Sequence, residues 1–180
     1  MNKLRQSPAP RPALMLASLL AGLLLVPWTV VRAEQIKDLY EMEVLGVAAA
    51  PGGDLAIGQA GQTAILLRSK EAKRELTLFV GPFEAQSIAV PLQQMKPLRP
   101  LTHDLTLSLL AAFRSHLGRV IISDFKDNTY YATLYIETDG KEMTVDSRPS
   151  DAIALALRAG APIYASSKAL DGASTNRPPR

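Results

Sequence analysis

The stretch VDSRPSDAIALALRAGAPIYAS, residues 145–166, decides how this chain folds. Pro149 and Ser150 are residue types that favour the first turn of a helix. Apolar residues follow at helical spacing, and Gly160 stands where glycine commonly ends a helix. Pro162–Ala165 has the pattern of a short strand. The stretch therefore predicts a helix that begins at Ser150, ends just before Gly160 and leads directly into a strand.

The residues before this stretch predict an antiparallel meander. Alternating apolar and polar residues are interrupted twice, by Asp127-Asn128 and by Asp139-Gly140. Both dipeptides consist of residue types that tight hairpin turns favour. The three expected strands are Arg119–Asp124, Thr129–Glu137 and Lys141–Val145.

The rest of the chain adds strands and separated helices. Expected strands are Glu41–Ala48, Thr63–Leu67 and Leu76–Val80, and expected helices are Phe83–Gln94, which Pro91 should kink or end, and Thr102–His116, which Gly118 should close. Ser167–Arg180 has the composition of a disordered tail. The sequence thus predicts an α+β fold, a single compact domain over residues 34–166 with a mixed, largely antiparallel sheet and about three helices.

The first 33 residues have the order of an export signal. Basic Lys3, Arg5 and Arg11 precede a 19-residue apolar run, Ala13–Val31, and Val31-Arg32-Ala33 then has small side chains at the two positions that a signal peptidase reads. We expect cleavage after Ala33 and an exported, periplasmic or cell-envelope protein. The run is also long enough for a retained inner-membrane anchor, so membrane attachment stays open as an alternative.

The leader also accounts for the basic character of the chain. Of 20 basic residues four lie in the leader, which leaves 16 basic residues against 17 acidic ones and a net charge of −1. The sequence pI near 9.3 is therefore no indication of nucleic-acid binding. The absence of cysteine excludes disulfides and thiolate metal sites.

Each of three predicted helix starts has a proline at or before its first turn and an acidic residue within four residues of that proline. These acidic residues are Glu84, Asp104 and Asp151. A carboxylate at a helix start stabilises the helix by roughly 0.3–1 kcal/mol through the helix dipole. This effect alone is enough to explain the acidic residue at any one of the three starts. If the three starts converge, however, they bring these carboxylates and that of Asp146 close to His103, Arg99 and Arg148.

Such a cluster has the chemistry that phosphodiester hydrolysis needs. Carboxylates without thiolates suit a hard divalent cation, Mg²⁺ or Mn²⁺. A histidine can move protons near neutral pH, and arginine can hold a phosphate through two parallel hydrogen bonds. Tyr130, Tyr131 and Tyr135 could stack on bases, but their alternation with aliphatic residues is more typical of packing in a strand.

Three blocks of this sequence resemble the bifunctional nuclease domain family. They are Gly81-Pro82-Phe83-Glu84-Ala85, Arg99-Pro100-Leu101-Thr102-His103-Asp104-Leu105 and the stretch from Val145 to Tyr164. The likeness runs from about Met42 to Ser166. It implies a compact α+β domain, a homodimer, and nuclease activity on both DNA and RNA. Thr77, Ser147 and Pro91 depart from the family pattern, and so does the export signal.

The resemblance and the helix-start argument select the same residues. The expected catalytic residues are His103, Asp104 and Glu84, the expected substrate-binding residues are Arg99, Arg148 and Ser150, and the expected metal ligands are Asp104, Asp146 and Asp151. The alternative is that Arg148 is only a structural ion-pair partner for Asp104 or Glu84.

Two functions fit these residues. The first is an exported, metal-assisted nuclease that hydrolyses DNA and RNA. The second is a non-catalytic module of the cell envelope whose polar pocket binds a small anionic ligand or a protein partner.

Overall fold

The computed structural model describes residues 38–49, 63–71 and 73–175, all within a compact unit that runs from Gln35 to Arg180. The predicted leader, residues 1–33, lies outside the described residues. Within them, no helix is both long and apolar enough to cross a membrane.

Seven strands form one mixed sheet in the order β3-β2-β1-β7-β4-β5-β6. Their bounds are β1 Leu39–Ala49, β2 Thr63–Ser69, β3 Glu75–Val80, β4 Ser115–Lys126, β5 Thr129–Thr138, β6 Lys141–Ser147 and β7 Ile163–Ser166. Only the pairing of β4 with β7 is parallel. All the other neighbouring pairs are antiparallel, as predicted. The α+β class is confirmed.

The predicted meander is present as β4, β5 and β6. Asp127 and Asn128 both have positive φ angles, 50° and 59°, and so do Asp139 and Gly140, at 50° and 73°. Two successive residues of positive φ give a turn whose twist matches that of the flanking strands, which is why these residue types occur there.

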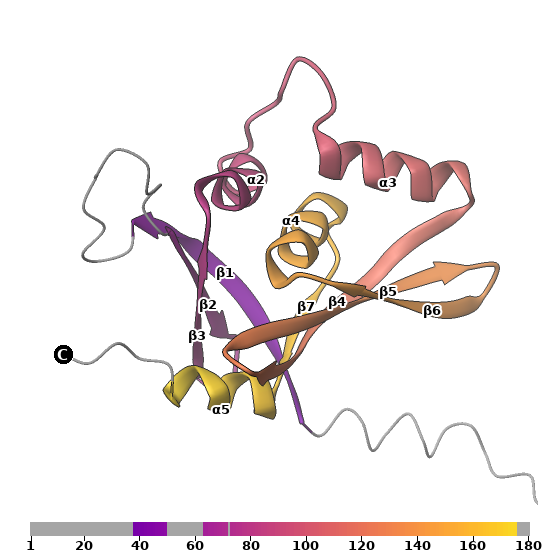
Figure 1. Ribbon diagram of the computed structural model, residues 1–180. Helices are drawn as coiled ribbons and strands as arrows, with labels where there is room; N and C mark the ends of the chain where they lie inside the picture. The colour runs from indigo at the N-terminus through magenta and orange to yellow at the C-terminus, as the bar shows by residue number, and fades with distance from the viewer. Residues whose placement is uncertain (1–37, 50–62, 72, 176–180) are drawn as a thin grey trace, which may run out of the picture. The chain divides into compact units, whose positions relative to one another are not determined.

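Helices α2 (Pro82–Leu92), α3 (Thr102–Ala112) and α4 (Pro149–Ala159) lie on one side of the sheet, and α5 (Ser167–Thr175) lies apart from them, beside β3 and β4 (Figure 1). Helix α2 ends at Leu92, one residue after Pro91, and Gln94 just beyond it takes a positive φ of 53°. Helix α4 ends at Gly160, which adopts the left-handed conformation, as predicted.

Helix α4 is the centre of the core. Five consecutive residues, Ala152–Ala156, are buried, because the helix contacts α2 and α3 on one side and β4 and β5 on the other. The small alanines let these neighbours approach closely, while Ile153 and Leu155 fill the space between them. The position of α4 fixes where its first turn, Arg148 to Asp151, meets the other helices.

The predicted end of the helix expected at Thr102–His116 is wrong. Helix α3 stops at Ala112, Arg114 takes a positive φ of 56°, and β4 begins at Ser115. Leu117 has helical spacing relative to the earlier leucines, but it is buried as a strand residue of β4. Gly118 lies within β4, where a Cβ atom would come within 2.8 Å of Oε1 of Glu137. The glycine therefore allows a close side-chain approach and does not close a helix.

The predicted disordered tail is wrong over its first nine residues, since Ser167–Thr175 form α5. Ala169 and Leu170 are buried, and Gly172 packs so tightly on Phe125 that a Cβ atom would lie 2.5 Å from Phe125 Cβ. These contacts pack the segment against β4, and an ion pair between Arg74 and Asp171 adds to them. The last five residues of the predicted tail lie outside the described residues.

Candidate functional site

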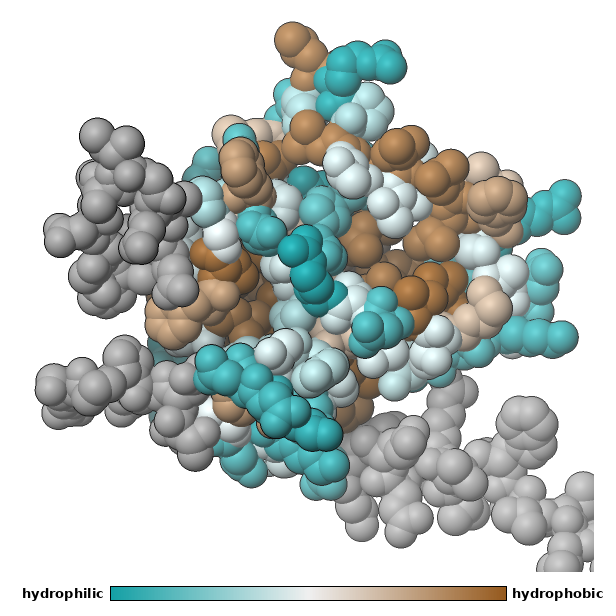
Figure 2. Space-filling view, in the orientation of Figure 1, coloured by the Kyte–Doolittle hydropathy of each residue, from teal (hydrophilic) through white to brown (hydrophobic). Residues whose placement is uncertain are grey.

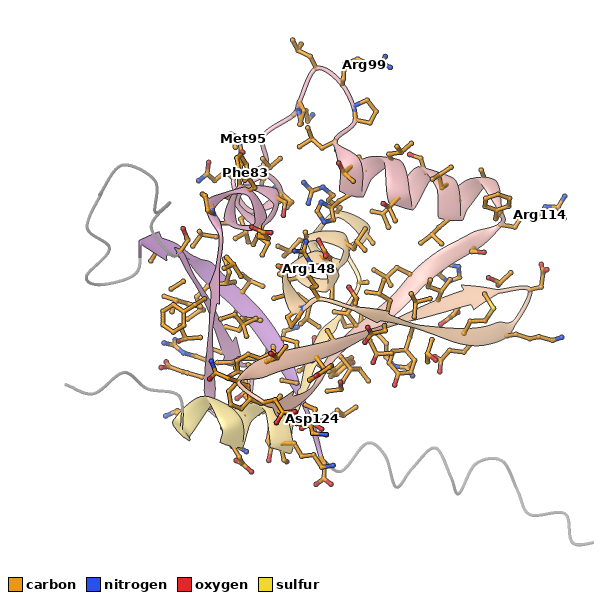
Figure 3. All side chains as sticks on the ribbon, in the orientation of Figure 1. Phe83, Met95, Arg99, Arg114, Asp124 and Arg148 are labelled. Carbon is orange, nitrogen blue, oxygen red and sulfur yellow. The ribbon has the colours of Figure 1, made fainter. Side chains whose placement is uncertain are left out.

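Arg148 joins the start of α4 to α2. The proline that follows it keeps its backbone extended, with φ −69° and ψ 144°, so the residue precedes the helix. Its Nε donates to Oδ2 of Asp151 at 2.7 Å and its Nη2 to Oδ1 at 3.2 Å, while Nη1 donates to Oε1 of Glu84 at 3.2 Å. Figure 3 shows Arg148 beside the first turn of α4. One guanidinium thus holds a carboxylate from each of two helix starts.

Asp151 also connects this pair to α3. Its Oδ1 lies 3.2 Å from Nε2 of His103, whose side chain is 16% exposed. Burial alone would raise the pKa of Asp151, but the hydrogen bonds from Arg148 and His103 outweigh burial and lower it. The hydrogen bond to Asp151 raises the pKa of Arg148 in turn. Asp151 is therefore an acceptor at neutral pH, which directs the Nε2–H of His103 toward it and leaves Nδ1 as the basic nitrogen of the neutral ring.

These side chains line a pocket of about 430 Å³. Its lining comprises Phe83, Glu84, Gln86, Ser87, Leu101, Thr102, His103, Arg148, Asp151 and Arg158. Figure 2 shows hydrophilic side chains running down the middle of this face with hydrophobic surface on both sides. The starts of α2, α3 and α4 therefore converge on this pocket, as the hypothesis from the sequence requires.

Arg158 is a member of this pocket that the sequence argument missed. Its side chain is only 7% exposed. Nε donates to Oδ1 of Asp104 at 2.9 Å, and Nη1 donates to the carbonyl oxygens of Ser87, at 2.7 Å, and Ala154, at 2.9 Å. Nη2 is buried and has no hydrogen-bond partner among the described residues. A buried guanidinium nitrogen that lacks an acceptor is a position where an oxygen of a ligand or of water would be stabilised.

A signal for Arg158 is present in the sequence. It follows Asp151 by seven residues, which is two helical turns, so both side chains lie on one side of α4. A cation on an otherwise buried helix needs an acidic partner, and Asp104 supplies it.

The structure brings together only part of the predicted site. Glu84, His103, Arg148 and Asp151 line the pocket. Asp104 instead binds Arg158 and accepts a hydrogen bond from the backbone N–H of Leu101 at 2.8 Å. Figure 3 shows Arg99 on the connection between α2 and α3, with its side chain directed away from the pocket.

Asp146 and Ser150 lie to either side of Arg148 in the sequence but in different surroundings. Asp146 is exposed on the edge strand β6 and is not part of the pocket lining. Ser150 is buried and lines a second pocket, not the one that contains His103.

The predicted metal ligands do not fit a metal site at these positions. Asp104 is committed to Arg158, Asp151 to Arg148 and His103, and Asp146 lies on a separate strand. The described part of the chain contains no group of three or more histidine, aspartate or glutamate side chains that could hold a metal ion.

Of the two ion-pair partners expected for Arg148 in a purely structural role, the structure has Glu84. The other, Asp104, pairs with Arg158 instead. The pair with Glu84 differs from a buried ion pair, however, because 63% of the Arg148 side chain is exposed. Its hydrogen bonds use three of the five guanidinium N–H groups, and an exposed guanidinium can exchange carboxylate contacts for phosphate contacts.

A second pocket, of about 340 Å³, lies on the other side of Arg148. Its lining comprises Leu78, Phe79, Val80, Gly81, Glu84, Asn128, Thr129, Tyr130, Arg148, Pro149 and Ser150. Glu84 and Arg148 line both pockets, so this ion pair forms the wall between them.

The model of the bifunctional nuclease domain matches residues 65–178 of this chain. The chain is also similar to two proteins of Mycobacterium tuberculosis, uncharacterized protein MT1877 of strain CDC 1551 / Oshkosh and uncharacterized protein Rv1829 of strain ATCC 25618 / H37Rv. Each is 43% identical over 103 residues, which cover 57% of this chain. The matched region spans 61% of the length of each relative.

Proposed function

Because the chain belongs to the bifunctional nuclease domain family, we propose that it hydrolyses phosphodiester bonds in DNA and RNA at the pocket that contains His103 and Arg148. The observation that carries the proposal is the convergence of three helix starts on one guanidinium and one histidine. The pocket holds a proton-transfer group, an exposed cation and a buried cation with an unpaired donor, and phosphodiester hydrolysis uses all three.

In the proposed reaction a water oxygen attacks phosphorus while the bond from phosphorus to one ester oxygen breaks. Arg148 holds non-bridging oxygens of the phosphate, and Arg158 adds positive charge at the buried end of the pocket. Nδ1 of His103 takes a proton from the attacking water or, once protonated, gives one to the leaving oxygen. Asp151 orients the ring through Nε2.

The charge of the chain without its leader predicts modest affinity for nucleic acid. A net charge of −1 provides little of the general attraction to a polyanion that dominates binding in basic proteins. Recognition in this proposal therefore depends on the local cations Arg148 and Arg158. We also propose that the leader, residues 1–33, exports the domain to the periplasm or cell envelope.

Exchanging Arg148 for glutamine is expected to slow cleavage about 10-fold or more, because a hydrogen bond to a charged group contributes roughly 1.5–3 kcal/mol. Labelled single-stranded DNA and RNA are incubated with residues 35–180, and the initial rates are compared. Arg114→Gln is the matched control, since Figure 3 shows Arg114 at the far end of α3 with its side chain directed outward. Parallel reactions contain Mg²⁺, Mn²⁺ or EDTA.

Three results are informative. Cleavage that Arg148→Gln weakens and Arg114→Gln leaves intact supports the proposal. Loss of cleavage in EDTA would show that cleavage depends on a divalent metal ion. No cleavage of either polymer under any condition would remove the nuclease assignment and favour the non-catalytic envelope module.

We further propose that the domain forms a homodimer through α3. The structure describes no buried residue in this helix, and Leu101, Leu105, Leu109 and Phe113 follow one another every four residues with exposed side chains. Leu105 is 54% exposed and Leu109 51% exposed. An apolar stripe of this kind is typical of an interaction surface, and the same stripe would serve a protein partner of the envelope module.

The dimer is tested by analytical ultracentrifugation of residues 35–180. We expect the wild-type protein to sediment as a dimer and the Leu105→Glu, Leu109→Glu double variant as a monomer, because both charges would be buried at the interface. Circular dichroism should be the same for both, since neither side chain belongs to the core. A wild-type protein that stays monomeric at all concentrations would rule out this interface.

A further inference from the structure

The second pocket is an open cavity lined by three segments that are distant in the sequence. They are the end of β3 with the first turn of α2, the turn between β4 and β5 with the start of β5, and the first residues of α4. Figure 1 shows the β4–β5 hairpin reaching across the molecule toward β3. The volume of about 340 Å³ lies within the range of small-molecule sites, roughly 300–1,000 Å³.

Tyr130 is the aromatic residue that this hairpin contributes to the pocket. It lies two residues before Ala132 in β5, and both therefore point to the face of the sheet that carries α4. Its ring packs against Phe125, with centroids 4.4 Å apart and an angle of 44° between the planes. Burial raises the pKa of Tyr130, so its phenol is neutral at physiological pH. The ring is thus a fixed, uncharged surface.

The lining of the second pocket combines apolar and hydrogen-bonding groups. Leu78, Val80 and Pro149 supply apolar surface, and Asn128 and Thr129 add an amide and a hydroxyl group at the turn. A nucleobase has matching parts, a flat ring that stacks on aromatic side chains and polar edges that form hydrogen bonds. A sugar or a small anion alone would leave the apolar surface without a partner.

The shared wall determines where a base would lie relative to the phosphate. Glu84 and Arg148 border both pockets, so a phosphate on Arg148 has the His103 pocket on one side and the Tyr130 pocket on the other. A nucleotide chain that crosses Arg148 places the nucleoside next to this phosphate at the second pocket.

We propose that the Tyr130 pocket binds one unpaired nucleoside of the substrate, which makes single-stranded DNA and RNA the substrate class. This inference rests on the nuclease function proposed above. A base within a duplex is stacked on both faces and paired at its edge, so it enters the pocket only after leaving the helix, at a cost of a few kcal/mol. Single strands and loops do not carry that cost.

Binding is tested apart from cleavage with a short single-stranded oligonucleotide that contains 2-aminopurine, a base whose fluorescence falls when it stacks. With residues 35–180 we expect saturable quenching. Tyr130→Leu should weaken binding about 5-fold to 150-fold, since stacking on an aromatic side chain contributes roughly 1–3 kcal/mol per base. Tyr131→Leu is the matched control, because Tyr131 points to the opposite face of β5 and is not in the lining.

A second variant and a competition experiment test the same inference in case Tyr130→Leu folds poorly. Asn128→Gly removes the amide and tolerates the positive φ of 59° at this turn, and it should weaken binding about 2-fold to 10-fold. Unlabelled single strands should compete at lower concentration than a duplex of the same sequence. Equal competition by the duplex, or unchanged binding by Tyr130→Leu and Asn128→Gly, would overturn the inference.

Failure of this inference and failure of the nuclease proposal give different results. Cleavage with no effect of either variant on quenching would leave the nuclease without this subsite. Quenching that depends on Tyr130, in a protein that cleaves neither DNA nor RNA, would leave the nucleoside site in place and remove the nuclease function.

Discussion

Replacing Arg158 by alanine is expected to lower the free energy of unfolding by about 3 kcal/mol, because the hydrogen bonds of the buried guanidinium to Asp104, Ser87 and Ala154 are lost together. Arg158 connects three elements, because it extends from α4 to Asp104 on α3 and to the Ser87 carbonyl on α2. Its loss leaves the Ser87 carbonyl and the Asp104 carboxylate without this donor. Urea denaturation of residues 35–180 measures the effect through the transition midpoint.

The control for this experiment is Lys96→Ala, which removes a cation from the exposed connection between α2 and α3. It should change the free energy of unfolding by less than about 0.5 kcal/mol. A double-mutant cycle with Asp104→Ala then isolates the pair, for which we expect a coupling of about 1–3 kcal/mol. An Arg158→Ala protein as stable as the Lys96→Ala protein would show that Arg158 does not hold the three helices together.

The parts of the fold that the sequence predicts are those that local chemistry determines. Asp139-Gly140 requires a turn of positive φ, Gly160 ends a helix in the left-handed conformation, and both occur as predicted. The order of the strands in the sheet cannot be predicted from local chemistry, because it depends on contacts between distant segments. The parallel pairing of β4 with β7, across the intervening meander and α4, has no local signal.

The errors also have physical causes. Leu117 continues the helical spacing of α3, but burial against the core in β4 stabilises it more than an exposed position on a lengthened helix would. In the tail, composition predicts disorder, whereas the burial of Ala169 and Leu170 orders α5. In both cases tertiary burial decides between local conformations that the sequence leaves close in energy.

The residues of the candidate site differ in how far the sequence predicts them. Glu84, His103 and Asp151 are predictable, because each lies in or beside a first turn and the first turns converge. Arg99 also lies beside a predicted helix start, yet the connection that carries it leads away from the pocket. Arg158 lies at no helix start and reaches the pocket from the last turn of α4 through the length of its side chain.

The His103→Ala substitution is expected to lower kcat/KM for cleavage of single-stranded nucleic acid by about 100-fold to 10,000-fold, the range that proton transfer by a positioned side chain contributes. The expectation depends on the hydrogen bond from Nε2 to Asp151, which leaves Nδ1 of the neutral ring free to take a proton. Initial rates measured over a range of substrate concentrations give kcat/KM, and the unfolding midpoint of each variant confirms that it is folded.

Two further variants separate proton transfer from structure. His116→Ala removes the other histidine, which is 70% exposed and lies beside Glu137 on the sheet, and it should cleave like the wild type. His103→Asn keeps a side-chain N–H that can donate to Asp151 but cannot transfer a proton near neutral pH, so it should be as inactive as His103→Ala. If His103→Asn instead cleaves at the wild-type rate, the residue only positions Asp151 and Arg148, and the base must be sought elsewhere in the pocket. Glu84 would then be the first alternative, because its carboxylate lines the same pocket and faces the same guanidinium.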